Sequence, residues 1–329
     1  MQSFEWIDAS SVEQAASLLA GGSAQAPVLA KAGGMDLLDL MKEGIITPAR
    51  LVNLKTIREL ARYEVRPSGE VAIGALTTLA QIAAAPEIRE RYRALADAAE
   101  HAATPQVRNA ATIGGNLLQK PRCWYYRNEF FHRAEAEEGD PARLGQNQYN
   151  AIFDNGKSSL VHASTPATAL TAYDAKIELV GPGGKRRLVP AREFFLPPMM
   201  KSGRETVIEP GEVLTQVVLP ALPAGTKAAY HKQTERDSYD WPICDVAVVL
   251  QMEGKAVRAA SIWMGWVAPT PRRAQESEQI LIGKSMDERV AAEAAKAAVA
   301  GATPLSKNAY KVPILEVVVR RTILAAANS

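Results

Sequence analysis

Apolar residues in the first part of the chain switch between helical and strand-like spacing. Residues 10–14 read SSVEQ, a capping-box start, and predict a helix that stops at the next glycine pair. The apolar run 28–30 predicts a strand, and the apolar positions within 37–41 predict a helix. Gly33 and Gly34 therefore lie in a turn between a strand and a helix.

Strand-like runs and one long alanine-rich stretch follow up to residue 219. The stretch begins at Thr77 or Thr78, is interrupted by Pro86 and ends at Thr104–Pro105, so we expect mainly helix there. A short strand, two hairpins and a further strand are expected at 51–54, 63–65 with 71–73, 176–180 with 186–189, and 212–219.

The pattern changes after the Pro- and Gly-containing linker 220–225. Three strands are expected first and three helices afterwards, an order typical of an α+β domain. The strands are expected at 228–233, 246–252 and 257–266, and the helices at 273–281, 286–300 and 312–326. We accordingly divide the chain into domains 1–222 and 223–329, with subdomains of about 1–57 and 58–222 in the first.

Composition narrows the classes of protein to consider. The 329 residues are 47% hydrophobic, and 38 basic residues nearly balance 36 acidic ones, so no strong field favours nucleic acid or an anionic membrane. The N-terminus MQSFEWIDASS lacks a signal peptide, and no apolar run reaches the ~18 residues of a membrane span. We expect a cytoplasmic protein, with export to the periplasm only alongside a partner.

Two glycine pairs carry the candidate chemistry. Residues 29–38 read LAKAGGMDLL and residues 111–118 read ATIGGNLL. Because glycine lacks Cβ, such a turn lets the backbone approach a phosphate closely, and free N–H groups can then bind the anion. We expect a second close-approach turn at Gly114–Gly115, with the Asn116 amide beside it. Neither GxGxxG nor GxxxxGK[ST] is present, which argues against a nicotinamide fold and a P-loop hydrolase.

The order of longer motifs adds a resemblance. The segments KAGGMDLL, IGALTTLAQI, TPQVRNAATIGGNLLQ, GEVLTQVVLP, YHKQ, VAPTPRRA and PLSKNAYKV occur in this order over nearly the whole chain. Together they resemble the FAD-binding subunits of molybdenum hydroxylases, the group of xanthine dehydrogenase, carbon monoxide dehydrogenase and aldehyde oxidoreductase. The resemblance implies an α+β fold: a two-subdomain FAD-binding fold of the vanillyl-alcohol-oxidase/PCMH type, followed by a small sheet-plus-helices domain.

The same resemblance implies which residues bind FAD. Those of the first turn would hold the pyrophosphate, those of the second subdomain would line the cofactor, and two would lie at the flavin end. They are Lys31, Ala32, Gly33, Gly34, Met35, Asp36, Leu37 and Leu38; Ala103, Thr104, Thr112, Gly114, Gly115 and Asn116; and Leu214 and Lys232. Since a carboxylate repels phosphate, we assign the Asp36 side chain a capping or structural role. The Lys232 cation would favour an anionic reduced flavin.

Several positions depart from the family pattern. Thr165 stands where an aspartate is usual. The insertion at about 119–160 opens with PRCWYYR, which resembles subunits that carry a 4Fe-4S cluster, but it contains only Cys123, whereas a cluster needs four thiolates. We expect no metal site, and a packed Cys123. Four histidines show no metal-ligand spacing. Tyr239 and Trp241 are either core aromatics or a cover for the flavin ring.

The resemblance also implies a role. We expect a subunit that passes electrons from the 2Fe-2S clusters of a small subunit to an external acceptor, while a large molybdenum-cofactor subunit oxidises the substrate. No catalytic acid, base or nucleophile is recognisable in the sequence, as a relay subunit predicts. The alternatives are a stand-alone flavin oxidoreductase and a flavin-free scaffold subunit.

Overall fold

A parallel sheet begins the fold. The computed structural model describes residues 2–133, 141–156, 158–197 and 204–329. Strands β1 (Glu5–Asp8), β3 (Arg50–Asn53) and β2 (Val28–Lys31) pair in that order. Helix α1 (Val12–Ala20) starts at Ser11, whose Oγ accepts a hydrogen bond from the Gln14 N–H at 3.1 Å, as the capping pattern predicts. Helix α2 (Leu37–Lys42) follows the first glycine pair. Strand β1 had no prediction.

A five-stranded antiparallel sheet forms the second part. Its order is β4 (Tyr63–Val65), β5 (Val71–Gly74), β8 (Val213–Leu219), β6 (Lys176–Val180) and β7 (Arg186–Pro190). Both predicted hairpins are confirmed. The alanine-rich stretch forms α3 (Leu79–Ala84), α4 (Pro86–Arg91) and α5 (Arg93–Glu100), followed by α6 (Pro105–Ala110) and α7 (Ile113–Leu117); 3-10 turns occupy Arg58–Ala61 and Pro182–Gly184. Pro86 starts α4, where a missing N–H costs nothing.

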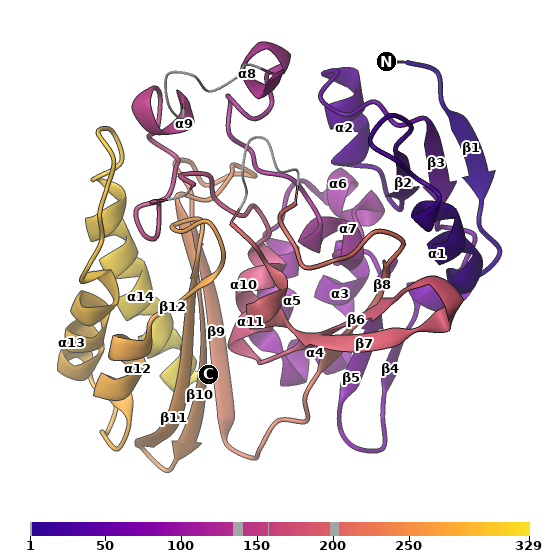
Figure 1. Ribbon diagram of the computed structural model, residues 1–329. Coiled ribbons are helices and arrows are strands. Elements are labelled where there is room, and N and C mark those ends of the chain that lie inside the picture. Colours follow the sequence, from indigo (N-terminus) through magenta and orange to yellow (C-terminus); the bar gives the residue numbers. More distant parts are fainter. Residues whose placement is uncertain (1, 134–140, 157, 198–203) are drawn as a thin grey trace.

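The C-terminal part contains the third sheet, in the order β12 (Arg272–Arg273), β11 (Ala256–Gly265), β10 (Cys244–Glu253) and β9 (Thr226–Gln233). Helices α12 (Gln275–Leu281), α13 (Glu288–Val299) and α14 (Lys311–Asn328) cover its outer face, and α5 and α10 (Thr165–Ala172) lie on its inner face (Figure 1). The predicted strands and helices here are confirmed. The core of the second sheet extends to Tyr230 and Ala247, so the two sheets share buried side chains across α5 and α10.

The insertion lies between α2 and the C-terminal helices, at the top of the view in Figure 1. It contains α8 (Glu129–Arg133) and α9 (Pro141–Leu144). Outside the insertion, α11 (Ala191–Phe194) follows β7. The fully buried Lys311 ammonium donates to the carbonyls of Tyr149, Asn150 and Trp266, at 3.1, 3.1 and 2.6 Å. The insertion is thereby attached to the C-terminal domain.

No helix in the described ranges combines the length and the apolar character needed to cross a membrane. The predicted α+β fold class is confirmed, with a small sheet-plus-helices domain at the C-terminus.

Candidate functional site

The first glycine pair forms the predicted turn between β2 and α2. Gly34 has a φ of +78°, a conformation that favours glycine. The backbone N–H groups of residues 33–36 donate to no hydrogen bond within the described chain. Four adjacent donors without a partner are what an anion such as a diphosphate requires.

Gly33 brings the first turn against the second subdomain. A Cβ added to Gly33 would lie 2.0 Å from the carbonyl oxygen of Ala110, the last residue of α6. The turn and the C-terminal end of α6 are therefore in direct backbone contact. At the other end of α6, Thr104 caps the helix, and Ala103 has a φ of +51°. Gly33 of the first subdomain therefore lies at one end of α6, and Ala103 and Thr104 of the second subdomain lie at the other end.

The second glycine pair is not the expected turn. Gly114 and Gly115 lie inside the short helix α7, whose N-cap is Thr112. The Gly114 N–H donates to the Ala75 carbonyl at 2.9 Å, and the Gly115 N–H donates to Thr112 Oγ1 at 3.2 Å. A Cβ on Gly114 would lie 3.0 Å from the Ala75 Cβ, so this glycine permits close packing of α7 on the chain after β5. The prediction of a second close-approach turn was wrong. Thr112 caps α7 and accepts the Gly115 N–H, so residues 114–115 are helical.

Asn116 is also engaged within the protein. Its Oδ1 accepts a hydrogen bond from Ser164 Oγ at 2.5 Å, and Ser164 is the N-cap of α10. The Asn116 amide, predicted to lie beside the cofactor, therefore connects α7 to α10 through its carbonyl oxygen.

Lys232 lies beside a cavity of about 410 Å³. Its Nζ donates to the carbonyl of His101 at 2.8 Å, which joins β9 to the end of α5. Burial lowers the pKa of the Lys232 ammonium, while Asp245 and Asp240 act in the opposite direction. Arg108 of α6 also lines the cavity, and its Nη1 donates to the Ala103 carbonyl at 2.7 Å. The lysine, α6 and the first turn therefore occupy neighbouring parts of one region.

Two family models divide the chain between them. The model for the FAD-binding domain in molybdopterin dehydrogenase matches residues 2–222, and that for the carbon monoxide dehydrogenase flavoprotein C-terminal domain matches residues 229–326. This chain belongs to the FAD-binding subunit family of molybdenum hydroxylases. FAD is accordingly its cofactor, and the chain is an oxidoreductase subunit, as the motif order predicted.

Individual members of the family match over most of this flavoprotein subunit. The aldehyde oxidoreductase FAD-binding subunit PaoB of Escherichia coli K12 is 32% identical over 250 residues, which cover 75% of this chain and 77% of that protein. The carbon monoxide dehydrogenase medium chain of Hydrogenophaga pseudoflava is 32% identical over 328 residues, which cover 98% and 96%.

Solved structures agree with these matches. The carbon monoxide dehydrogenase from Hydrogenophaga pseudoflava that lacks the Mo-pyranopterin moiety superimposes with a TM-score of 0.78 at 30% identity, covering 99% of this chain and 97% of that one. The overall fold of the flavoprotein subunit is therefore that of the medium chain.

Two side chains singled out from the sequence, the predicted contact Leu214 and the family departure Thr165, are buried in this flavoprotein subunit. Leu214 on β8 is 3% exposed and packs in the core of the second sheet. Thr165, in the position where the family usually has an aspartate, is buried at the start of α10 and donates to the Ala98 carbonyl at 3.1 Å. The Leu214 and Thr165 side chains are both buried. The contact of Leu214 with FAD stays a prediction.

Tyr239 and Trp241 had two interpretations, as core aromatics or as a cover for the flavin ring. Tyr239 is 57% exposed and lines the cavity beside Lys232. Trp241 is 51% exposed, and its ring stacks on that of Trp266 with 5.8 Å between centroids. The interpretation as core aromatics is therefore wrong for both residues.

The remaining residues of the first turn divide into packed and exposed ones. Lys31 Nζ lies 5.2 Å from the centroid of the Trp6 ring, and Ala32 packs against the core of the first subdomain. Met35 is 43% exposed, whereas Leu37 and Leu38 are half-buried. The Asp36 side chain makes no capping bond to α2 and instead binds residues of the insertion, which agrees with a structural role.

The insertion residues include one of the two cysteines. Cys123 packs against a small apolar cluster with Leu40 and Tyr126, and Cys244 is fully buried in the C-terminal core. In the described residues, no three His, Cys, Asp or Glu side chains gather as a metal site would require; the side chain of His132 lies outside them.

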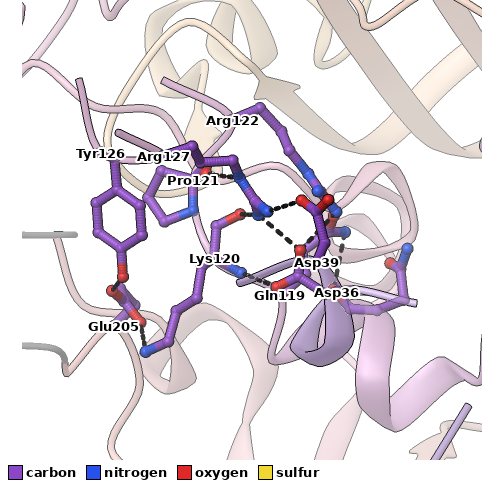
Figure 2. Close-up of polar contacts among 10 residues, drawn as sticks. Asp36, Asp39, Gln119, Lys120, Pro121, Arg122, Tyr126, Arg127 and Glu205 are labelled. Carbon is purple, nitrogen blue, oxygen red and sulfur yellow. Dashed lines mark hydrogen bonds and ion pairs between the residues drawn. The ribbon is translucent and has the colours of Figure 1, made fainter. Parts of the chain in front are cut away.

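Sequence reasoning missed the arginines of this region. Arg108 lines the cavity, and Arg122 and Arg127 bind Asp36 (Figure 2). The only sequence signal was their position inside the two quoted motifs TPQVRNAATIGGNLLQ and PRCWYYR, since arginine is common on any surface.

Proposed function

We propose that this flavoprotein subunit holds FAD between the first glycine turn and the cavity beside Lys232, and passes electrons from 2Fe-2S clusters of a small subunit to an external acceptor. A large subunit with a molybdenum cofactor would oxidise the substrate. One observation carries the proposal: Gly33 lies against Ala110 so closely that only hydrogen fits, and four N–H donors beside this contact have no partner among the described residues.

The residues present fit a flavin dinucleotide. The N–H groups of residues 33–36 would hold its diphosphate, because they are adjacent and donate to no other group in the described part of the chain. Thr104 and Thr112 are the N-caps of α6 and α7, and Ala103 directly precedes Thr104. These three remain proposed lining residues, together with Gly114, Gly115 and Asn116. When bound, FAD supplies a ring that takes up and releases electrons one or two at a time.

The chain itself contributes position and charge at the flavin end. The Lys232 ammonium is fixed by the His101 carbonyl; burial lowers its pKa, and Asp245 and Asp240 offset part of this effect. A fixed cation there stabilises negative charge on a reduced ring, which raises its reduction potential. Lys232→Gln, with an unchanged charge elsewhere, should therefore lower the potential of the bound flavin relative to Lys232→Arg.

The test is made in two stages on the full chain. Purified protein reconstituted with FAD should bind one flavin per chain and show the visible absorption of a bound flavin; a protein that binds none supports the scaffold alternative. Co-purification from the native host should then yield a molybdenum subunit and a 2Fe-2S subunit. An isolated subunit whose flavin is reduced directly by small aldehydes would instead support the stand-alone oxidoreductase.

A further inference from the structure

An ion-pair network lies directly behind the first glycine turn. Asp36 accepts hydrogen bonds from Arg127 Nη2 at 2.6 Å and from the Lys120 backbone N–H at 2.8 Å, and Arg122 Nη2 lies 2.9 Å from its Oδ1. Figure 2 shows both arginines pointing at Asp36 from the insertion. The three side chains are only 13–17% exposed, so solvent screens these pairs weakly.

The charges of this network balance. Lys120 pairs with Glu205, which also accepts a hydrogen bond from the Tyr126 hydroxyl at 3.1 Å. Arg127 binds Asp39 at 2.7 Å as well as Asp36. Three cations therefore meet three carboxylates, and no positive charge is left over for a phosphate. The network is suited to joining segments of the chain and not to binding an anion.

Arg122 makes a second contact, on the far side of the network. Its Cζ lies 4.6 Å from the centroid of the Trp241 ring, within the range of a cation–π interaction. Trp241 lies two residues after the segment in which Asp237, Ser238 and Tyr239 line the cavity beside Lys232. One guanidinium thus touches the carboxylate that follows the glycine turn and the loop at the flavin end.

We propose that Arg122 is a positioning residue that couples the two ends of the FAD site, by holding the glycine turn and the 237–241 loop in a fixed relation. This inference rests on the proposed function. Its consequence is specific: a change at Trp241 should weaken a ligand that occupies the diphosphate end alone, although Trp241 belongs to the other end.

The experiment uses ADP as a probe of the diphosphate end. Trp241→Leu should weaken ADP binding to the full chain by about threefold to tenfold, measured by calorimetry or by competition with FAD. Trp241→Phe keeps an aromatic face for the guanidinium and should bind ADP within about twofold of the wild type. Tyr63→Leu is the matched control, because Tyr63 is a partly exposed aromatic on β4 that does not belong to the lining of the cavity beside Lys232, and it should leave ADP binding unchanged.

A second measurement tests the coupling through Arg122 even if ADP alone binds too weakly to be measured. The affinities of Arg122→Gln, Trp241→Leu and the double variant for FAD should be non-additive, since each removes the same contact. Arg122→Lys keeps the charge near Asp36 and should fall between wild type and Arg122→Gln. Arg186→Gln removes an arginine–glutamate pair at the edge of the second sheet and should leave FAD affinity unchanged.

The outcomes separate this inference from the proposed function. Wild-type protein that binds neither FAD nor ADP overturns the proposed function. Wild-type protein that binds FAD, with additive effects of Arg122→Gln and Trp241→Leu, overturns the coupling alone. Equal losses of ADP affinity in Trp241→Phe and Trp241→Leu also contradict it, because the aromatic face would then not matter.

Discussion

The two glycine pairs look alike in sequence and differ in structure. Each follows a short apolar or small-residue run and precedes an apolar helix start. At residues 33–34 the chain turns sharply, and the N–H groups of residues 33–36 find no partner in the ranges that the structure describes. At residues 114–115 the chain is helical, and the N–H groups bind Ala75 and Thr112. Within the described residues, the first pair leaves its N–H donors available to the proposed ligand, whereas the N–H groups of the second pair bind inside the protein.

The difference shows what a Gly-Gly motif means physically. Removal of Cβ permits close approach, but the partner is set by whichever atoms the tertiary structure brings there. Gly33 is approached by the Ala110 carbonyl, and Gly114 by the Ala75 methyl group. The second pair therefore allows α7 to pack closely on Ala75, and the Asn116–Ser164 hydrogen bond joins α7 to α10.

Gly33→Ala should have the largest effect. Its Cβ would lie 2.0 Å from the Ala110 oxygen, so the turn must shift away from α6 and the four donors must move with it. We expect FAD affinity to fall by at least about 100-fold, about 2.7 kcal/mol, measured by titration of the full chain with FAD. An alanine variant that binds FAD normally would show that the turn does not hold the cofactor.

The next largest effect concerns the pH dependence of stability and depends on Asp245, which is fully buried beside α10. Tyr230 donates to its Oδ2 at 2.7 Å and Thr168 of α10 donates to its Oδ1 at 3.1 Å. Burial raises the pKa of this carboxyl to about 7. Between about pH 4 and pH 7 the folded chain keeps a proton that the unfolded chain has lost, so this group makes the free energy of unfolding fall as pH rises, by up to about 1.4 kcal/mol per pH unit.

Asp245→Asn should remove this contribution to the fall in the free energy of unfolding as pH rises. Urea unfolding at several pH values between about 4 and 7.5 would show it, with the exposed Asp237→Asn as the control that keeps the slope. An unchanged slope in Asp245→Asn would mean that another group titrates in this range.

Gly114→Ala tests the packing role of the second pair. A Cβ there meets the Ala75 Cβ at 3.0 Å and the Ala75 oxygen at 3.1 Å, so α7 must move by a few tenths of an ångström. We expect a loss of about 1–3 kcal/mol of stability from overpacking, with FAD affinity reduced by less than about threefold. A loss of FAD binding like that of Gly33→Ala, without a loss of stability, would erase the distinction between the two pairs.

Thr112→Ala should have the smallest effect. It removes the cap that accepts the Gly115 N–H and should cost about 1 kcal/mol of stability in thermal or urea unfolding. Thr112→Ser keeps the cap and should restore the stability. If FAD affinity falls in both variants while stability recovers in the serine variant, then the Thr112 methyl group contacts the cofactor.

Local patterns predicted most of the regular structure. The Ser11 cap, the strands 176–180 and 186–189 and the three C-terminal helices follow from periodicity and turn residues, which act over a few positions. Helix α10 was missed although Ser164 and Pro166 supply a cap and an N-terminal proline, because its residues are buried on all sides and show no amphipathic period.

The sequence by itself determined the strand, turn and helix around Gly33 and, through the order of its motifs, the family and its flavin. Only the tertiary structure decided that Gly33 meets Ala110, that Gly114 packs on Ala75, and that Arg122 reaches both Asp36 and Trp241. The reason is physical: turns and caps depend on neighbours in sequence, whereas close approach and charge pairing depend on neighbours in space, which distant segments supply.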